Sequence, residues 1–442
     1  MSLSPASVVD VSGSVVTLAV ISDTHGKTGR LWFQETADGT RIKPVVRYDH
    51  KGKPLPRKLV DEDSSGKMSE KVVDVDGGPE GKFETPEGES GASKSRKVVI
   101  PYADIFVHCG DFSMRGAESE IAEFIQFLRQ LPHAHKIVTP GNHDAILDTE
   151  FFSSFCEQKK CSDSTTSDRG RESLNLSSRT KDSNQSVAKV AKGLTREAAK
   201  KLSLRLKKEL RSVCTYLDEE MLELDVKGID SDANYRLRVF GSPIQPHPWT
   251  RKTLGEEVGG SCGNVVEAET TTPKNGIEWA FGRNRGSEIA ENWARIPRET
   301  DILITHGPPF GRHDRVELLG ETKEHALFHS GCADLLTEVE NRVRPLVHLF
   351  GHVHEDPGWS YNANGSTLFL NAAVLDRSYN LRTTVIEEQQ EDLERRKRPW
   401  VETRLIQAGQ ETRNEDSSST SSTADLVFTP LLSIPIECLQ KH

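Results

Sequence analysis

The chain contains five short apolar runs, and each is followed closely by aspartate, asparagine or histidine residues. The runs are residues 18–21, 105–107, 137–138, 302–304 and 346–350, and the polar residues after them are, in the same order, Asp23 and His25; Asp111; Asn142 and His143; His306; His352 and His354. A buried strand that leads directly into coordinating side chains is how an α/β sheet presents chemistry at the carboxyl ends of its strands. Five such junctions in one chain predict an α/β fold in which distant segments build one site.

The types of these side chains indicate a pair of divalent metal ions. Asp23 and Asp111 are the two carboxylates of the set, whereas asparagine and histidine bind metals as neutral groups. Two divalent cations, two carboxylates and a bridging hydroxide leave a net charge of roughly +1, which suits an anionic phosphate ester. Asp111, central in the order of the motifs, is expected to bridge the two ions. Mixed imidazole, carboxylate and amide ligands favour manganese, iron or zinc over magnesium.

His143 is predicted to act on the substrate and not to bind a metal ion. It adjoins Asn142 on one turn, and adjacent side chains diverge, so a metal-bound Asn142 leaves His143 near the leaving-group oxygen. An alkoxide leaving group needs a proton, which histidine supplies near neutral pH. Arg312 and His313, beyond the Gly-Pro-Pro turn after His306, are candidates for substrate binding; the alternative for His313 is a surface or loop residue.

Other polar residues of the motifs have simpler interpretations. His108 and His348 lie inside strand-like runs and are interpreted as core or supporting groups, not as ligands. His325 and His329 are interpreted as surface or loop residues, and Asp144 as a turn residue.

The motifs resemble the five blocks of the calcineurin-like metallophosphoesterases, and they occur in that family's order. The residues that carry the resemblance are Asp23-Thr24-His25, Gly110-Asp111, Gly141-Asn142-His143, Thr305-His306-Gly307-Pro308 and Gly351-His352-Val353-His354. Within the superfamily the chain is most similar to the brain-type metallophosphoesterase-domain-containing group, with supporting stretches at residues 131–144, 279–297, 306–309 and 344–354.

The resemblance implies a fold and a ligand set. The implied fold is a four-layer α/β/β/α sandwich of two packed mixed sheets, the metallo-dependent phosphatase fold, here with long disordered insertions. The implied ligands are Asp23, His25, Asp111 and His354 for one metal ion and Asp111, Asn142, His306 and His352 for the other, with His143 as the catalytic histidine that binds neither.

The expected activity is that of a binuclear metal-dependent phosphoesterase. A hydroxide that bridges the metals would hydrolyse a phosphate ester, and a small phosphodiester of the cyclic-nucleotide kind is favoured. Protein serine/threonine phosphatases carry an acid three residues after the bridging aspartate, where this chain has Met114, and this departure weakens a protein-phosphatase interpretation. The alternatives are a phosphomonoesterase and a non-catalytic scaffold that keeps the fold.

Long polar stretches separate the motifs and predict one catalytic domain with insertions. In a domain of residues 15–386, the predicted insertions are 36–96, 157–195 and 251–275, followed by a disordered linker at 387–422 and a final strand within 423–434 that returns to the sheet. Segments with so few apolar residues cannot bury enough surface to offset the entropy of ordering.

Apolar residues at helical spacing predict two helices. The first covers residues 117–130, directly after the Asp111 loop, and should pack on the sheet. The second follows a leucine stripe from Leu202 to Leu217 in a basic stretch. A solvated basic face is the favoured interpretation of this helix, and membrane or calmodulin binding is the alternative.

Charge and cysteine content limit the partners. With 57 basic and 67 acidic residues the net charge is −10, so no global positive field attracts a nucleic-acid polymer. The seven cysteines show no metal-type spacing and fit reduced thiols. We therefore expect a cytoplasmic protein that acts on a small phosphate ester without membrane association; the basic run 395–398 makes a nuclear location the alternative, and no feature identifies a protein partner.

Overall fold

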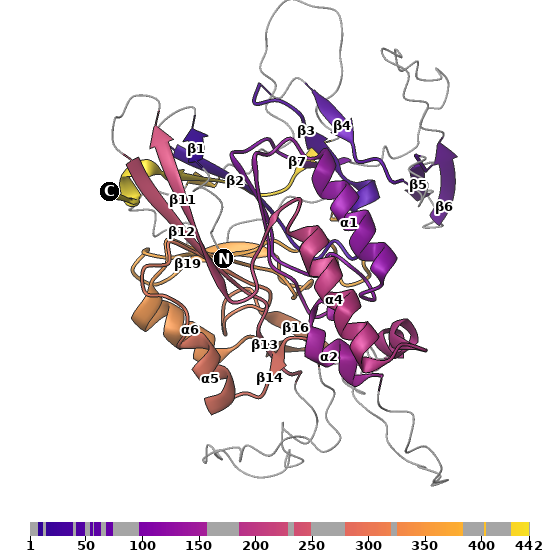
Figure 1. Cartoon of the computed structure of the whole chain (residues 1–442). Coiled ribbons are helices and arrows are strands. Elements are labelled where there is room, and N and C mark those ends of the chain that lie inside the picture. Colours follow the sequence, from indigo (N-terminus) through magenta and orange to yellow (C-terminus); the bar gives the residue numbers. More distant parts are fainter. Residues whose placement is uncertain are drawn as a thin grey trace, which may run out of the picture.

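The computed structural model describes residues 8–11, 15–38, 41–48, 54–55, 57–62, 68–73, 97–156, 185–228, 234–248, 279–319, 325–382, 402–403 and 426–441. Across these residues, two mixed β-sheets lie between two groups of helices (Figure 1). This arrangement confirms the predicted fold class, a four-layer α/β/β/α sandwich.

The first sheet has six strands within the described ranges, in the order β10–β9–β8–β2–β23–β21. Their bounds are β2 (Val15–Ile21), β8 (Ile105–His108), β9 (His135–Val138), β10 (Thr215–Tyr216), β21 (Glu402–Thr403) and β23 (Leu431–Pro435). Strands β2, β8, β9 and β10 are parallel, and β23 pairs antiparallel with β2.

The second sheet has eight strands in the part of the chain that is described. The main path is β1–β11–β12–β15–β18–β20–β19, and β24 pairs with β12. Their bounds are β1 (Val8–Val11), β11 (Glu220–Gly228), β12 (Asn234–Ser242), β15 (Ile302–Thr305), β18 (Val347–Phe350), β19 (Gly358–Tyr361), β20 (Leu368–Asn371) and β24 (Gln440–Lys441). Strands β12, β15, β18 and β20 are parallel, so the motif residues that follow β15 and β18 lie at the same edge of the sheet.

Three hydrophobic layers hold the sandwich together, because successive side chains of a strand point to opposite faces of its sheet. The layer between the sheets includes Leu18, Val20, Ile304, Leu349 and Leu370. The next residues along the same strands face outward, with Ala19 and Ile21 on one side and Leu303, Phe350 and Phe369 on the other. Each fully buried Leu, Ile or Phe contributes about 1.5–3 kcal/mol relative to exposure.

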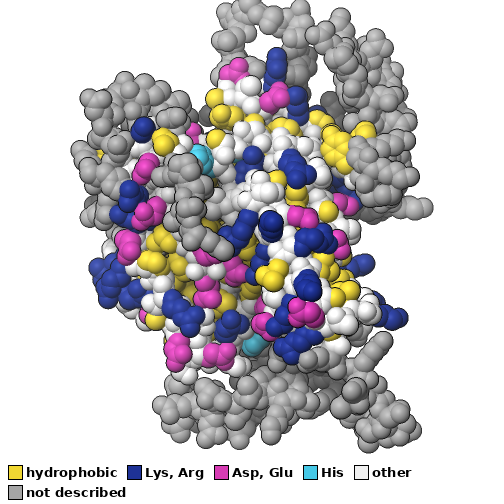
Figure 2. Space-filling view, in the orientation of Figure 1, with side chains coloured by type: hydrophobic (Ala, Val, Ile, Leu, Met, Phe, Trp, Pro, Cys, Tyr) yellow, Lys and Arg dark blue, Asp and Glu magenta, His cyan; other side chains and the backbone are white. Residues whose placement is uncertain are grey.

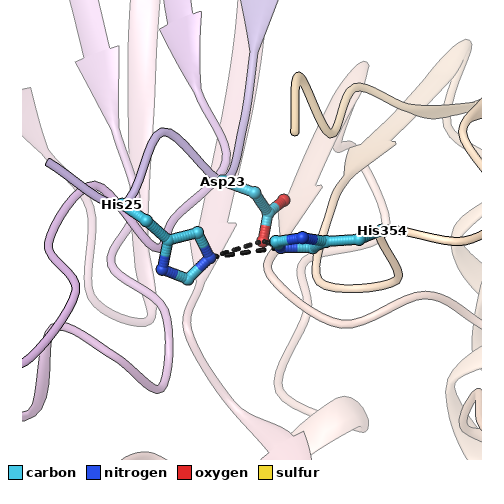
Figure 3. A group of neighbouring side chains, drawn as sticks. All are labelled: Asp23, His25 and His354. Atoms are coloured by element: carbon cyan, nitrogen blue, oxygen red, sulfur yellow. Dashed lines mark hydrogen bonds and ion pairs between the residues drawn. The ribbon is translucent and has the colours of Figure 1, made fainter. Parts of the chain in front are cut away.

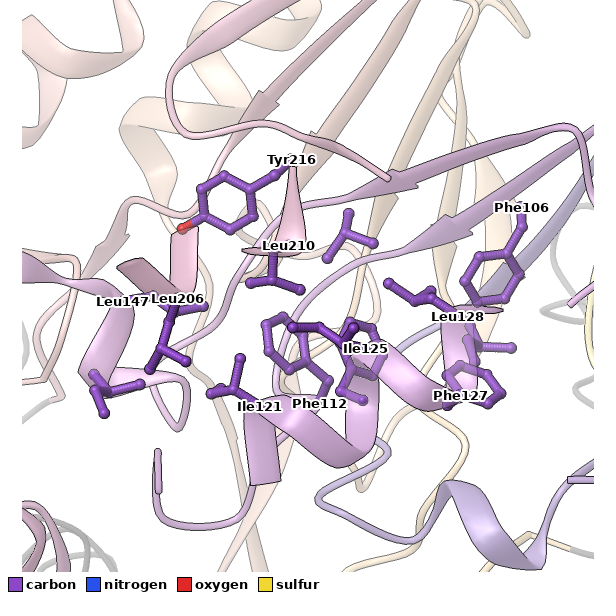
Figure 4. Close-up of a cluster of buried hydrophobic side chains, with 14 of the residues drawn as sticks. Phe106, Phe112, Ile121, Ile125, Phe127, Leu128, Leu147, Leu206, Leu210 and Tyr216 are labelled. Carbon is purple, nitrogen blue, oxygen red and sulfur yellow. The ribbon is translucent and has the colours of Figure 1, made fainter. Parts of the chain in front are cut away.

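Helices cover the outer faces of both sheets. Helices α1 (Glu118–Gln130), α2 (Thr149–Ser154), α4 (Arg196–Leu210) and a helix at residues 185–191 pack on the six-stranded sheet. On the other side lie α5 (Ser287–Trp293) and α6 (Ala333–Glu338), the latter continued by the π-helical turn η4 (Val339–Val343). Ile121, Ile125 and Leu128 of α1 point into the outer core as predicted (Figure 4).

Helix α4 has the predicted basic face, and acidic residues balance its charge. Lys200 pairs with Glu150, Arg205 with Glu118, Lys207 with Asp218 and Arg211 with Glu220. Figure 2 shows basic and acidic side chains interspersed on this face of the molecule. The helix ends at Leu210, so the predicted stripe residues up to Leu217 lie beyond it. These pairs favour the solvated-face interpretation.

Smaller elements lie outside the two sheets. They are β3 (Trp32–Gln34), β4 (Ile42–Pro44), β5 (Arg57–Glu62), β6 (Met68–Val73), β7 (Lys97–Ile100), β13 (Gln245–Pro246), β14 (Gly282–Arg283), β16 (Arg315–Leu319), β17 (His325–His329) and β22 (Leu426–Phe428), with short helical turns η1 (Thr28–Arg30), η2 (Ala145–Leu147) and η7 (Ile436–Cys438).

Several of these elements fall within the predicted insertions and end segments. Strands β4, β5 and β6 lie within 36–96, and the helix at 185–191 lies within 157–195. The predicted final strand is two strands: β22 pairs with β7, and β23 is the one that returns to the sheet beside β2. Residues 157–184 and 251–275, and all of 387–422 except β21, lie outside the described residues.

None of the helices in the described ranges combines the length and the apolar character that a membrane span requires. Cys109, Cys156, Cys214, Cys332 and Cys438 are free thiols.

Candidate metal centre

The predicted site residues lie where the carboxyl ends of parallel strands from both sheets meet. The six-stranded sheet supplies Asp23, His25, Asp111, Asn142 and His143, and the eight-stranded sheet supplies His306, His352 and His354. A backbone bridge joins the sheets at this edge: Ser22 N–H donates to Ala372 O (2.9 Å), and Val374 N–H donates to Ser22 O (3.1 Å). The fold thereby brings together His25 and His354, which are 329 residues apart in the chain.

Asp23, His25 and His354 form the first cluster (Figure 3). The Nε2 atoms of the two histidines are 3.1 Å apart. Oδ1 of Asp23 lies 3.3 Å from Nε2 of His354 and 3.8 Å from that of His25. Among the described residues this buried oxygen has no hydrogen-bond partner. A buried carboxylate oxygen that has no hydrogen bond and faces two imidazole nitrogens fits a site for a cation.

His306, His352 and Asn142 form the second cluster, on the other side of Asp111. Nε2 of His306 lies 3.3 Å from His352 Nδ1 and 3.1 Å from Asn142 Oδ1. Asp111 Oδ2 is 3.2 Å from His306 Nε2 and 3.7 Å from His25 Nε2. One carboxylate oxygen therefore faces both clusters, which is the geometry that a bridging ligand requires. The seven side chains fit a pair of divalent metal ions.

The backbone is strained at four of the seven residues. Asp23, His25, Asp111 and His352 have positive φ angles of 57°, 40°, 56° and 69°. Such conformations cost about 1–3 kcal/mol each for residues other than glycine, and they cluster at ligand-binding sites, where the surrounding structure enforces them.

Glycines leave the space in which these ligands approach one another. A Cβ at Gly110 would lie 2.5 Å from His306 Nδ1, and one at Gly351 would lie 2.1 Å from Asp23 Oδ2. A Cβ at Gly141 would lie 2.3 Å from Asp111 Oδ1. Any larger residue at these three positions would displace a predicted ligand.

Backbone carbonyls orient the imidazoles of two predicted ligands. His306 Nδ1 donates to Cys109 O (2.9 Å), and His354 Nδ1 donates to Asp376 O (3.1 Å). Because a carbonyl oxygen only accepts, both Nδ1 atoms carry a hydrogen, and Nε2 is the nitrogen that faces the cluster.

His143 is also held by a backbone carbonyl. Its Nδ1 donates to Met114 O (2.7 Å), and its backbone N–H donates to Asp111 Oδ1 (2.8 Å). A ring nitrogen of His143 lies within 4.8 Å of the ligand atoms of His25 and Asp111. The side chain at position 114 is not an acid, but the main chain at that position supplies the oxygen that orients the imidazole.

Electrostatics keep the carboxylates of the two predicted ligands Asp23 and Asp111 ionised. Burial by itself would raise the pKa of Asp23, but the adjacent His354 holds this pKa well below its usual range. In the same way burial opposes ionisation of Asp111, and His306 lowers the pKa of this carboxyl well below its usual range. Both side chains are therefore anionic and ready to bind a cation.

The imidazoles of the predicted ligands differ in the direction in which their pKa is shifted. Burial and the nearby His143 lower the pKa of His25, and burial together with His306 lowers the pKa of His352 to about 3, so both are neutral, as metal binding requires. Burial opposes protonation of His306, yet Asp111 raises its pKa to about 9. A metal ion beside Asp111 would take the place of that proton.

Asp144 lies in a turn, as predicted, and its carboxylate also links the loop that contains Asp111 to the loop that contains Asn142. Its carboxylate accepts from Ser113 N (2.9 Å), Ser113 Oγ (2.7 Å) and Gly141 N (2.8 Å). Burial, together with the charge of Asp111, raises the pKa of Asp144 to about 7.

The two predicted substrate-binding residues have other contacts. Arg312 donates to Tyr361 O (3.0 Å) and Glu340 Oε1 (2.7 Å), and its guanidinium lies 4.7 Å from the centre of the Phe369 ring. His313 is buried, not on the surface, and its carbonyl accepts from Asn371 Nδ2 (3.1 Å). These contacts give Arg312 and His313 roles in packing against β19 and β20, and the substrate role stays a prediction.

Two aromatic residues adjoin the predicted ligands: Tyr379, and Trp279 from the supporting stretch 279–297. The Tyr379 ring lies edge-on to His25 and His354, at centroid distances of 5.0 and 5.1 Å. The Trp279 ring lies 4.9 Å from that of His352. Tyr379 has no polar neighbour in sequence that resembles a ligand motif, so only the fold reveals its position.

Comparisons with known proteins find a matching family model and similar sequences. The model of the calcineurin-like phosphoesterase family matches residues 16–187. Human metallophosphoesterase domain-containing protein 1 is 30% identical over 287 residues, which cover 65% of this chain and 64% of that protein; the mouse protein of that name gives the same values. The UPF0046 protein C25E10.12 of Caenorhabditis elegans is 30% identical over 278 residues, which cover 63% of this chain and 69% of that protein. The chain thus spans slightly less than two thirds of the two mammalian relatives.

Proposed function

The chain belongs to the calcineurin-like phosphoesterase family, and on that basis we propose that it is a metal-dependent phosphoric ester hydrolase. The observation that carries the proposal is Asp111 Oδ2, which lies 3.7 Å from His25 Nε2 in one cluster and 3.2 Å from His306 Nε2 in the other. A pair of divalent cations held by these clusters would activate a water molecule and polarise the phosphoryl oxygens of a bound ester.

His143 is the proposed general acid. With Nδ1 held by Met114 O, the other ring nitrogen of the protonated imidazole is left to donate to the leaving-group oxygen. The hydrogen bond from the main-chain N–H of His143 to Asp111 Oδ1 ties the main chain at His143 to the carboxylate that faces both clusters. The position of the general acid relative to the metal ligands would therefore stay constant during the reaction.

A small phosphodiester, such as a cyclic nucleotide, is the proposed substrate. The seven ligands include only two carboxylates, so a loaded site would remain electropositive and attract an anionic ester. Met114, which stands where protein phosphatases have an acidic side chain, weakens a protein-phosphatase interpretation. The mixed ligand set supports manganese, iron or zinc as the metals. Free cysteines and a net charge of −10 support a cytoplasmic protein without a nucleic-acid polymer as partner.

The test is hydrolysis by the full chain after removal of metals and reloading with Mn²⁺. We expect metal-dependent cleavage of bis(p-nitrophenyl) phosphate that exceeds cleavage of p-nitrophenyl phosphate, and cleavage of at least one cyclic nucleotide from a panel. Faster cleavage of the monoester would replace the diesterase proposal by a phosphomonoesterase. Protein that binds two Mn²⁺ ions yet cleaves none of these esters would favour the scaffold.

A further inference from the structure

Two buried histidines outside the ligand set each bond to a threonine beside a ligand. Nε2 of His108 lies 3.1 Å from Thr24 Oγ1, and Nε2 of His348 lies 2.9 Å from Thr305 Oγ1. All four side chains are buried, with relative exposures of 0% for both histidines and for Thr305, and 1% for Thr24. Each sheet contributes one such pair: His108 ends β8 next to β2, and His348 lies in β18 next to β15.

The surrounding hydrogen bonds determine the direction of both contacts. Gly110 N–H donates to His108 Nδ1 (3.2 Å), so the hydrogen of this neutral ring is on Nε2, which donates to Thr24. The hydroxyl of Thr305 donates its one hydrogen to Gly307 O (2.7 Å), so its oxygen must accept the hydrogen bond from His348 Nε2. Burial lowers the pKa of each imidazole to about 3, which agrees with neutral rings. Two different sets of partners thus give the same tautomer and the same direction.

Each threonine lies where a ligand-bearing turn begins. Thr24 stands between Asp23 and His25, whose φ angles are both positive, so its side chain anchors the most strained turn of the first cluster. Thr305 precedes His306, and its bond to Gly307 O closes the backbone around that ligand. A histidine that fixes the threonine therefore fixes the direction in which the adjacent ligand leaves the strand.

We propose that His108 and His348 are positioning residues, one for each metal position. His108, through Thr24, sets Asp23 and His25 of the first cluster, and His348, through Thr305, sets His306 of the second. The inference rests on the metal centre of the proposed function and adds that the two positions are supported separately. Supporting hydrogen bonds of this kind change metal affinity by about 10–100-fold.

The test measures Mn²⁺ binding to the purified full chain by calorimetric titration. We expect two Mn²⁺ ions per wild-type chain. In His348→Leu and in Thr305→Val, one ion should bind with unchanged affinity and the other about 10–100-fold more weakly. Thr305→Ser keeps the hydroxyl, and His348→Gln keeps an N–H donor near the place of Nε2. Both variants should therefore keep most of the wild-type Mn²⁺ affinity. Thr305→Val is nearly isosteric, so it provides the answer if His348→Leu does not fold.

Ligand variants assign the affected position. With the first cluster disabled by His25→Ala, the His348→Leu substitution should weaken the remaining Mn²⁺ ion. With the second cluster disabled by His352→Ala, His348→Leu should hardly change the affinity for the remaining Mn²⁺ ion. In that background His108→Leu should weaken the binding of this ion instead. Equal weakening of both positions, or unchanged binding in Thr305→Val and Thr24→Val, would overturn the inference.

His133→Leu is the matched control. This imidazole is also buried, its Nε2 donates to Pro101 O (3.0 Å), and its Nδ1 is unpaired like that of His348, but its bond is to the start of the β7–β8 loop and to no ligand-bearing turn. Its variant should lose stability while keeping both affinities. Loss of metal affinity in the control would also contradict the positioning role. If wild-type chain binds no pair of Mn²⁺ ions, the failure lies with the proposed function.

Discussion

Gly141→Ala should reduce metal binding far more than it reduces stability. Gly141 precedes Asn142, and its φ angle is not in the positive range, so the backbone accepts alanine there. The added Cβ, however, would lie 2.3 Å from Asp111 Oδ1, 2.6 Å from the main-chain nitrogen of Asp111 and 2.7 Å from His306 Cε1. Ordinary contact begins at 3.4 Å, so the shared carboxylate must recede by about 1 Å.

The structure gives the size of both effects. Metal–ligand distances tolerate deviations of about 0.2 Å, and a displacement several times larger should lower Mn²⁺ affinity at least 10–100-fold, at both positions because Asp111 faces both. Overpacking of a dense region costs about 1–3 kcal/mol of the free energy of unfolding. A urea titration of the metal-free protein measures the second quantity, and calorimetric titration with Mn²⁺ measures the first.

Gly307→Ala is the matched control for this substitution. Gly307 adjoins the ligand His306 as Gly141 adjoins Asn142, but a Cβ there would meet nothing closer than Gln245 Cβ at 3.4 Å. We expect nearly wild-type Mn²⁺ affinity in this variant. Two tightly bound ions in Gly141→Ala, or an equal loss of affinity in Gly307→Ala, would refute the reasoning that space around Asp111 governs the site.

Three further predictions test the charges and proton donors of the molecule. His143→Ala should keep both Mn²⁺ ions but lower turnover by about 10²–10⁴-fold, because the imidazole is placed to protonate the leaving group; an unchanged rate would exclude that role. Asp111→Asn should lose metal from both positions, because the carboxylate that faces both clusters becomes neutral, and elemental analysis showing full occupancy would contradict the bridging assignment. Burial raises the pKa of Asp301 from 3.8 to about 6, so between these pH values the folded chain binds more protons than the unfolded chain, and the free energy of unfolding should fall as the pH rises. Asp301→Asn keeps an acceptor for Arg238 N–H and should flatten this part of the stability–pH profile in urea titrations. An unaltered slope would show that another group causes the pH dependence.

Much of the fold was predictable because burial imposes its own patterns on a sequence. The runs at 302–304 and 346–350 are strands β15 and β18, with every described residue of both strands buried, and the helical spacing at 117–130 is α1. Strand β22 shows where this reasoning reached its limit. Its apolar residues predict a strand but not a partner, and it pairs with β7 outside the two large sheets, while β23 pairs with β2.

The candidate site divides in the same way. Side-chain chemistry after each strand predicts Asp23, Asp111 and His306 as ligands, and in the structure Asp23 Oδ1 lies 3.3 Å from His354 Nε2 and Asp111 Oδ2 lies 3.2 Å from His306 Nε2. The position of Arg312 after the Gly-Pro-Pro turn suggested a role in substrate binding, but in the structure its guanidinium packs on the Phe369 ring. The direction of a side chain beyond a turn depends on contacts that are distant in sequence.

By itself the sequence determined the candidate metal ligands and the strands that carry them, because residue type and hydrophobic spacing are local properties. Only the tertiary structure decided what orients those residues. Met114 O, Cys109 O and Asp376 O hold His143, His306 and His354 in place, and every residue has such an oxygen, so its use depends on where the folded backbone places it. The same holds for the bonds of His108 and His348 to Thr24 and Thr305, which exist because parallel strands align residues that lie far apart in the chain.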